Sequence, residues 1–142
     1  MISTFCYVGC IGRMPGTWGS LASLAIWAPL VLLNASPPIR LAFILFVFLI
    51  GWWATHHSRH QFKSLDPKEV VIDEVAGMGL TLAFCPADIS SIVAAFLLFR
   101  FLDIVKPWPI SWVDRKVKSA LGVMMDDMVA GLIGAVILSL LV

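Results

Sequence analysis

Five carboxylates stand in three groups, each at one end of a strongly apolar stretch of the sequence. Asp73 and Glu74 open one stretch, Asp103 closes the next, and Asp126 and Asp127 open the last. Carboxylates at membrane depth are costly and mark functional sites by default. Because like charges raise one another's pKa, the five acids need a cation to stay ionised together. Solvated helix N-termini, where acids favour the helix dipole, are the alternative interpretation.

A hard divalent cation with oxygen ligands, Mg²⁺ above all, is the natural partner of such a set. The predicted metal ligands are Asp73, Glu74, Asp126 and Asp127. The predicted catalytic acids are Asp73, Glu74, Asp103 and Asp127, one of which serves as general base.

A short sequence pattern occurs twice and links two of these groups. Residues 73–77 and 127–131 share the pattern Asp-x-x-Ala-Gly, with the acid four residues before the glycine and on the same helix face. Glycine lets another backbone approach that face. Two helices packed at their glycines would bring Asp73 and Asp127 together, although coincidence in an Ala/Gly-rich chain is the alternative.

Residues 13–20 are predicted to form a glycine-bearing loop that leads into a helix. Main-chain N–H groups at a helix start suit a phosphate, and Thr17 and Ser20 add hydroxyl donors. We predict that Thr17, Gly19 and Ser20 contact substrate. The Gly-Lys-Ser/Thr ending of a Walker loop is missing, and an ordinary N-cap turn explains the segment equally well.

Residues 99–110 carry a third candidate. Arg100, Asp103 and Lys106 step by three, which predicts one shared helical face. Arg100 and Lys106 are predicted to hold a phosphate while Asp103 stays near the metal. An anchor at the membrane surface with an intrahelical ion pair is the alternative.

Other nucleophiles and ligands fit less well. None of the three cysteines is followed by arginine six residues later, and no Asp-x-Asp pair exists, which disfavours phosphocysteine and phosphoaspartate mechanisms. Direct attack by a water that a metal activates is preferred. His56, His57 and His60 have no suitable thiolate or carboxylate beside them, which favours a solvated role at a membrane boundary over a zinc site.

Composition sets the class of protein that carries these groups. The chain has 142 residues, 60% of them apolar and only 13% charged, against about 25% charged in soluble domains. A soluble domain this small has too little interior for so much apolar surface. These figures exclude a disordered chain, a nucleic-acid binder and an ordinary soluble enzyme. We predict one integral-membrane domain over residues 1–142.

The predicted architecture is all-α: a compact bundle of about five membrane-embedded helices plus a short amphipathic surface helix. The apolar stretches are 21–33, 41–54, 67–84, 88–105 and 123–142, with the basic surface piece at 111–120. Asp66 is predicted to cap the third helix, with Pro67 at its first position and Glu69 completing a capping box.

Basic residues predict the orientation. Five alternating spans place nine of the ten on one side of the membrane, namely Arg13, Arg59, Lys63, Lys68, Arg100, Lys106, Arg115, Lys116 and Lys118. Only Arg40 falls on the other side, and the positive-inside rule assigns the crowded side to the cytoplasm. All carboxylates but Asp88 fall on that side too, as a polar site at one membrane face would require.

Four motifs, at 15–21, 71–78, 99–110 and 122–131, resemble the phosphatidylglycerophosphatase A family of bacterial membrane lipid phosphatases. Their order is the family's, and the Lys-Pro-Trp-Pro-Ile string is highly specific. The resemblance implies an all-helical fold and Mg²⁺-dependent hydrolysis of phosphatidylglycerophosphate to phosphatidylglycerol, at the cytoplasmic face of the inner membrane. The implied partners are this substrate and membrane lipid, with no nucleic acid.

Two other classes stay open. A small ion-coupled transporter would use the carboxylates as a cation pathway, but it predicts acids near the midplane rather than on one side. A non-catalytic membrane subunit would dock a soluble partner and release no phosphate. A lipid phosphotransferase is disfavoured because its Asp-Gly-x-x-Ala-Arg start is absent.

Overall fold

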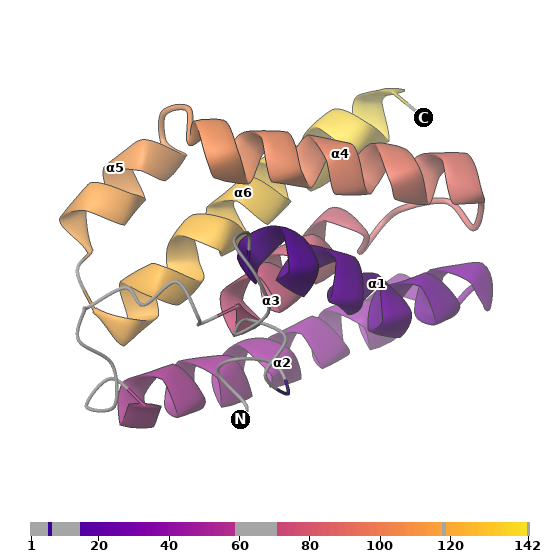
Figure 1. Cartoon of the computed structure of the whole chain (residues 1–142). Coiled ribbons are helices and arrows are strands. Elements are labelled where there is room, and N and C mark those ends of the chain that lie inside the picture. Colours follow the sequence, from indigo (N-terminus) through magenta and orange to yellow (C-terminus); the bar gives the residue numbers. More distant parts are fainter. Residues whose placement is uncertain (1–5, 7–14, 59–70, 118, 142) are drawn as a thin grey trace.

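The computed structural model describes residue 6 and residues 15–58, 71–117 and 119–141, which form six α-helices and no strand (Figure 1). The helices are α1 (Pro15–Leu32), α2 (Pro37–Ser58), α3 (Ile72–Thr81), α4 (Ile89–Val105), α5 (Ile110–Lys116) and α6 (Ala120–Leu141). The predicted all-α class is confirmed.

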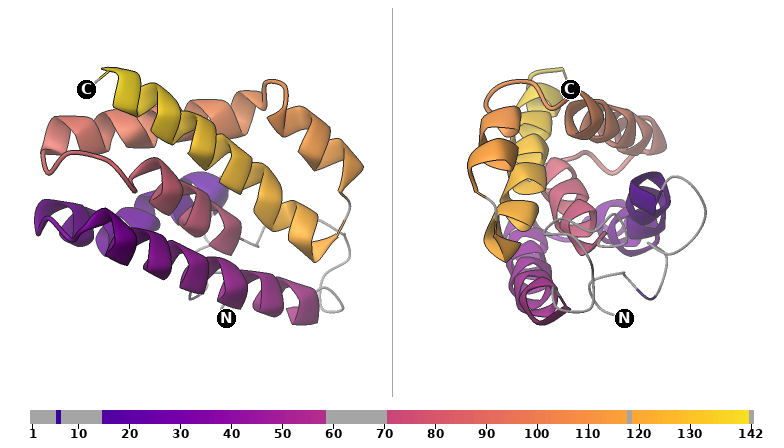
Figure 2. Two further views of the ribbon diagram at one scale, coloured as in Figure 1. Left: turned by 180° about the vertical axis from the view of Figure 1, so that it is seen from behind. Right: turned by 60° about the vertical axis from the view of Figure 1, so that its left-hand side comes forward.

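The short helix α3 lies at the centre of the bundle. It packs against α1, α2, α4 and α6, most extensively against α6 (Figures 1 and 2). Helix α5 packs on the first half of α6, at the end of the molecule where α2 finishes. The first turn of α3 therefore faces the end of α4 and the start of α6.

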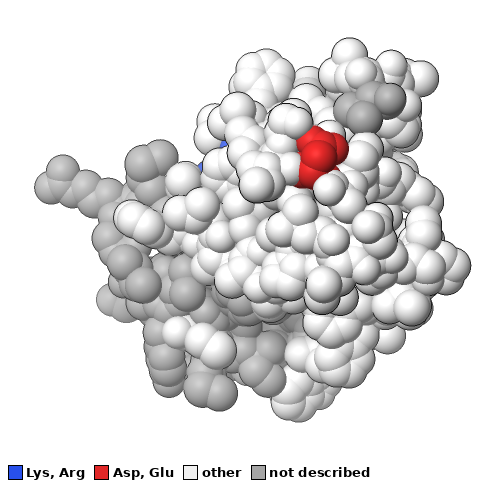
Figure 3. Space-filling view, turned by 90° about the vertical axis from the view of Figure 1, so that its right-hand side faces the viewer, with Lys and Arg blue, Asp and Glu red and all other residues white. Residues whose placement is uncertain are grey.

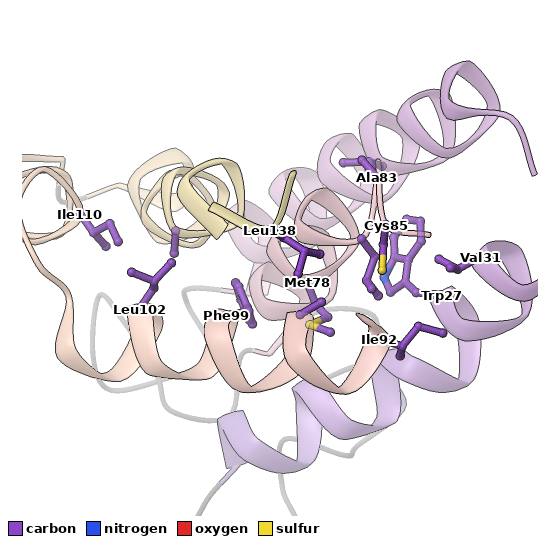
Figure 4. Close-up of a cluster of buried hydrophobic side chains, with 14 residues drawn as sticks. Trp27, Val31, Met78, Ala83, Cys85, Ile92, Phe99, Leu102, Ile110 and Leu138 are labelled. Carbon is purple, nitrogen blue, oxygen red and sulfur yellow. The ribbon is translucent and has the colours of Figure 1, made fainter. Parts of the chain in front are cut away.

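The main core surrounds α3 and consists of large apolar side chains (Figure 4). Trp27 of α1, Met78 of α3 and Phe99 of α4 are each at most 1% exposed. The Trp27 indole Nε1 also donates a hydrogen bond to the Val75 carbonyl oxygen at 2.8 Å, which fixes α1 against the first turns of α3.

Two of the described helices are long and apolar enough to cross a membrane. They are the segments Pro37–His57 and Ala120–Leu141. Large apolar side chains such as Phe46 and Trp53 of α2 are more than half exposed. Figure 3 views the end of the molecule where α2 and α4 begin, and its described surface there is almost free of charge. These features are compatible with membrane association.

The third predicted helix differs most from the structure. Val71 precedes α3 in a non-helical conformation, and α3 ends at Thr81 rather than near Phe84. Val71 is fully buried, and its side chain lies against Gly19 of α1. The predicted capping box of Asp66, Pro67 and Glu69 lies outside the described residues.

Arg40 explains the early end of α3. Its guanidinium donates hydrogen bonds to the carbonyl oxygens of Leu82 and Cys85, at 3.3 and 2.9 Å. The carbonyl groups that follow a helix end need such donors. Arg40 is 6% exposed and therefore serves inside the protein, whereas the sequence placed it in an outer loop.

Helix α1 begins at Pro15, so residues 15–20, which the sequence predicts as a loop, form the first turns of the helix instead.

The boundaries of the later helices are closer to expectation. Helix α2 begins four residues before the predicted stretch, at Pro37, and runs on through the two histidines to Ser58. Helix α4 begins after Asp88, whose carboxylate accepts a hydrogen bond from the Ser91 N–H at 2.8 Å as an N-cap. The surface helix is shorter than predicted, because α5 ends at Lys116.

Candidate active site

The five carboxylates singled out in the sequence gather around the first turn of α3. Glu74 interacts electrostatically with Asp73, Asp103 and Asp126, and Asp127 interacts with all four. Asp126 and Asp127 are 5% and 3% exposed, and Asp73 is 9% exposed. Three helices thus bring one dense group of acids together inside the protein.

Close contact between α3 and α6 produces this grouping. A Cβ on Gly77 would lie 2.5 Å from the Asp127 carbonyl oxygen, and one on Gly131 would collide with the Gly77 carbonyl oxygen. Thr81 Oγ1 lies 3.3 Å from the carbonyl oxygens of both glycines. The predicted packing of the two Asp-x-x-Ala-Gly segments at their glycines is confirmed.

Two glycines of α1 make room for Glu74. A Cβ on Gly16 would collide with Glu74 Oε1, and a Cβ on Gly19 would lie 2.8 Å from Glu74 Oε2. The Glu74 side chain is only 12% exposed, and its Oε2 has no hydrogen-bond partner in the part of the chain that the structure describes. The glycines of the first motif therefore bring helix backbone directly against a buried carboxylate.

Arg100 joins the first motif to the acids. Its Nη2 donates to Thr17 Oγ1 at 3.1 Å, and its Nη1 donates to Ser20 Oγ at 3.3 Å. Nη1 also forms a short ion pair with Asp103 and lies 3.7 Å from Glu74 Oε1. Arg100 Nε is buried without a partner. Hydroxyls and a guanidinium thus converge beside the carboxylate group, an arrangement that suits a phosphate.

Lys106 lies apart from Arg100. Helix α4 ends at Val105, and Lys106 follows in the left-handed conformation with φ 46°. It is therefore not the third residue on the predicted helical face. Its Nζ donates instead to Asp114 Oδ1 at 2.8 Å and to Asp126 Oδ2 at 2.6 Å.

These hydrogen bonds shift the pKa values of Lys106 and Asp114, two residues that lie outside the candidate membrane spans. Burial lowers the pKa of Lys106, but the hydrogen bonds to Asp114 and Asp126 outweigh it and raise that pKa well above its usual value. The bond from Lys106 lowers the pKa of Asp114. Lys106 is therefore a cation whose ammonium group is hydrogen-bonded to two carboxylates.

Six carboxylates lie in or beside this group: Asp73, Glu74, Asp103, Asp114, Asp126 and Asp127. Among the described residues, Arg100 forms ion pairs with Glu74 and Asp103, and Lys106 forms ion pairs with Asp114 and Asp126. This donor set fits a divalent cation by its chemistry. Among the described residues, however, no three acid, histidine or cysteine side chains already converge closely enough to hold an ion.

The histidines lie elsewhere. His56 and His57 are exposed at the end of α2, where their rings pack edge to face and His57 Nδ1 lies 2.8 Å from the Trp53 carbonyl oxygen. His60 lies outside the described residues. Sequence reasoning gave no role to Asp114 and treated Arg40 as a loop charge, because neither belongs to a recognisable motif.

Comparison with known proteins identifies the family of the chain. The family model for phosphatidylglycerophosphatase A matches residues 1–142. The chain belongs to the phosphatidylglycerophosphatase A family. Members of this family are phosphoric monoester hydrolases, so the chain is an enzyme of that class.

Two relatives of the family carry the name phosphatidylglycerophosphatase A. The Escherichia coli K12 protein is 41% identical over 129 residues, covering 88% of this chain and 72% of its own length. The Haemophilus influenzae protein is 36% identical over 130 residues, covering 91% and 79%. A Bacteroides thetaiotaomicron protein, provisionally named a phosphatidylinositol-3-phosphatase, is 32% identical over 131 residues, covering 88% and 81%. No solved structure matches the chain.

Proposed function

We propose that the chain hydrolyses phosphatidylglycerophosphate to phosphatidylglycerol and inorganic phosphate, with Mg²⁺, as a step of phospholipid biosynthesis. Its family supports the substrate. The observation that carries the proposal is the Arg100 guanidinium, which joins the hydroxyls of Thr17 and Ser20 beside the buried acids. A phosphomonoester needs such donors on its oxygens and acids close by.

Binding begins with the terminal phosphate. Arg100 donates N–H groups to the phosphate oxygens, and the hydroxyls of Thr17 and Ser20 turn from Arg100 toward them. The free main-chain N–H groups in the first turn of α1, at Gly16 and Thr17, add partial positive charge. Charge-assisted bonds of this kind hold the phosphorus at a fixed position against the acids.

The acids Asp73, Glu74, Asp126 and Asp127 would hold Mg²⁺, with Asp103 beside them. The close grouping of these oxygen-bearing side chains supports this assignment. When bound, Mg²⁺ would supply positive charge against the phosphoryl group and lower the pKa of the attacking water.

Hydrolysis then requires one side chain that acts first as general base toward the water and then as general acid toward the leaving oxygen. Water attacks phosphorus, a new P–O bond forms, and the bond to the glycerol oxygen breaks. Glu74 Oε2, which is buried and has no hydrogen-bond partner among the described residues, accepts the proton that the water loses. The same proton passes to the glycerol oxygen as it leaves. Arg100 stabilises the charge that builds on the phosphoryl oxygens.

The proposed location follows from charge and exposed apolar surface. We place α1, α2, α3, α4 and α6 within the bacterial inner membrane and α5 at its surface, with the site facing the cytoplasm. The one-sided distribution of basic residues supports this orientation. Exposed apolar side chains on α4, such as Leu97 and Phe101, support its contact with lipid.

The decisive test is phosphate release by the purified protein. Detergent-solubilised protein is given phosphatidylglycerophosphate, with Mg²⁺ or with a chelator, and both products are measured. We expect release with Mg²⁺ only, and much less from phosphatidylinositol 3-phosphate. Arg100→Gln should lose most of the activity, and Arg115→Gln, which changes an exposed arginine, should not. Absence of release under every condition would favour a transporter or a non-catalytic subunit.

A further inference from the structure

Asp114 lies outside every motif of the sequence, yet it contacts the edge of the acidic group. It sits on α5 and accepts a hydrogen bond from Lys106 Nζ at 2.8 Å, while the same Nζ donates to Asp126 Oδ2 at 2.6 Å. The Asp114 and Asp126 side chains are 35% and 7% exposed. One ammonium group therefore connects a half-exposed carboxylate to a buried one.

The fold holds this bridge in place from three helices. Lys106 is the C-cap of α4, and its N–H is bonded to the Leu102 carbonyl oxygen. Ile110, fully buried, anchors α5 against α6, and Asp114 follows one helical turn later on the same face. Both ends of the bridge are thus attached to packed helices rather than to a loop.

Asp126 has both carboxylate oxygens occupied. Its Oδ2 accepts from Lys106, and its Oδ1 accepts from the Asp127 N–H at 3.0 Å. This carboxylate is therefore fixed in orientation, directly beside the more deeply buried Asp127. Lys106 has three N–H donors and would be free to turn toward solvent or substrate if Asp114 did not hold one of them.

We infer that Asp114 is a positioning residue of this enzyme, which acts by holding Lys106 on Asp126 and so fixes the Asp126–Asp127 pair for metal and substrate. The inference rests on the proposed function. Groups that orient ligands of a metal site change activity or metal affinity by about 10- to 100-fold when they are removed.

The test compares Asp114→Asn, Asp114→Glu and Arg115→Gln in the full-length protein. Asp114→Asn keeps the shape but loses the charge, and Asp114→Glu restores the charge. Arg115→Gln is the control on the same helix, because among the described residues the hydrogen bonds of Arg115 go to Ser111 and not to Lys106 or Asp126. We measure kcat, KM, the Mg²⁺ concentration for half-maximal activity, and the thermal unfolding midpoint.

We expect Asp114→Asn to lower kcat by about 10- to 100-fold and to raise the Mg²⁺ requirement, with little change in KM and with only the small fall in the unfolding midpoint that loss of the bridge to Lys106 causes. Asp114→Glu should recover most of both losses, and the control should match the wild type. Wild-type kcat and Mg²⁺ dependence in Asp114→Asn would overturn the inference. So would a loss that follows the unfolding midpoint and is not recovered by glutamate.

A second measurement separates this inference from the proposed function. The double-mutant cycle of Asp114→Asn with Lys106→Met, read by thermal unfolding, reports the bridge without any substrate. Coupling in the cycle supports the bridge, and its absence overturns it. An inactive wild type that still shows coupling would overturn the proposed function while leaving the bridge intact.

Discussion

Gly77 and Gly131 face each other with their main chains in contact, and the Gly77 carbonyl oxygen fills the place that a side chain on Gly131 would need. Each glycine lies four residues after an acid, Asp73 on α3 and Asp127 on α6. The contact therefore sets the distance between the two acids. Any side chain at either glycine separates the helices that carry the site.

Gly131→Ala should destabilise the protein, because its Cβ would meet backbone that cannot rotate away. We expect a loss of about 1–3 kcal/mol, the range for overpacking, together with reduced activity. Thermal unfolding in detergent measures the loss. Gly134→Ala is the matched control, since its Cβ would meet side chains rather than backbone, namely Thr81 at 3.1 Å and Leu102 at 3.7 Å. Equal effects of the two changes would argue against the backbone contact.

Gly16→Ala should reduce activity although alanine is the better helix former by roughly 1 kcal/mol. The added Cβ displaces the Glu74 carboxylate. A displacement of about 1 Å in a catalytic group lowers rates on the order of 100-fold. Initial rates compared with Leu21→Ala, a change on the exposed side of α1, provide the measurement. An active Gly16→Ala protein would remove Glu74 from the chemistry.

Arg40→Gln should destabilise α3, because the carbonyl groups of Leu82 and Cys85 lose their buried donor. Each buried group left without a partner costs about 1–3 kcal/mol. Arg40→Lys keeps the charge but lacks the planar fork, so an intermediate effect is expected. Urea or thermal unfolding measures the order of stability, which we expect to fall from the wild type through Arg40→Lys to Arg40→Gln. If Arg40→Gln unfolds like the wild type, the turn after α3 has another source of stability.

Asp127→Asn should nearly abolish the proposed phosphatase activity, by at least about 100-fold, and leave membrane insertion intact. It should also diminish the rise in melting temperature that Mg²⁺ binding causes by linkage. The control is Asp88→Asn, because asparagine caps a helix as well as aspartate does and Asp88 caps α4 far along the chain from the acids. Full Mg²⁺-dependent turnover in Asp127→Asn would leave the Asp-x-x-Ala-Gly segments with a packing role alone.

Cysteine labelling tests the orientation. In a background without the native cysteines, a cysteine that replaces Ser36 should react with an impermeant reagent added outside intact cells. A cysteine that replaces Lys116, exposed at the end of α5, should react only after the membrane is opened. The reverse pattern would place the acidic group on the outer side and contradict the positive-inside assignment.

The motifs of the site were predictable because each is local. Helix periodicity puts Asp73 and Gly77 on one face of a helix, and the same spacing puts Asp127 beside Gly131 on another. The two acids therefore come close together in any fold in which the two helices pack at their glycines. Likewise, apolar composition and prolines at residues 107 and 109 indicate where helices occur and where α4 must end.

The contacts between elements were not predictable in this way. Arg40 looks like a loop charge until α3 ends beside it, and Lys106 looks like the third residue of a helical face until the chain turns left-handed there. Sequence by itself determined the all-α class, the apolar character and the chemical groups of the site. Tertiary structure alone decided that α3 is short, that Arg100 meets Thr17, and that Lys106 meets Asp114. The physical reason is that a side chain's partner depends on packing between segments distant in the chain, whereas periodicity and capping depend only on its neighbours.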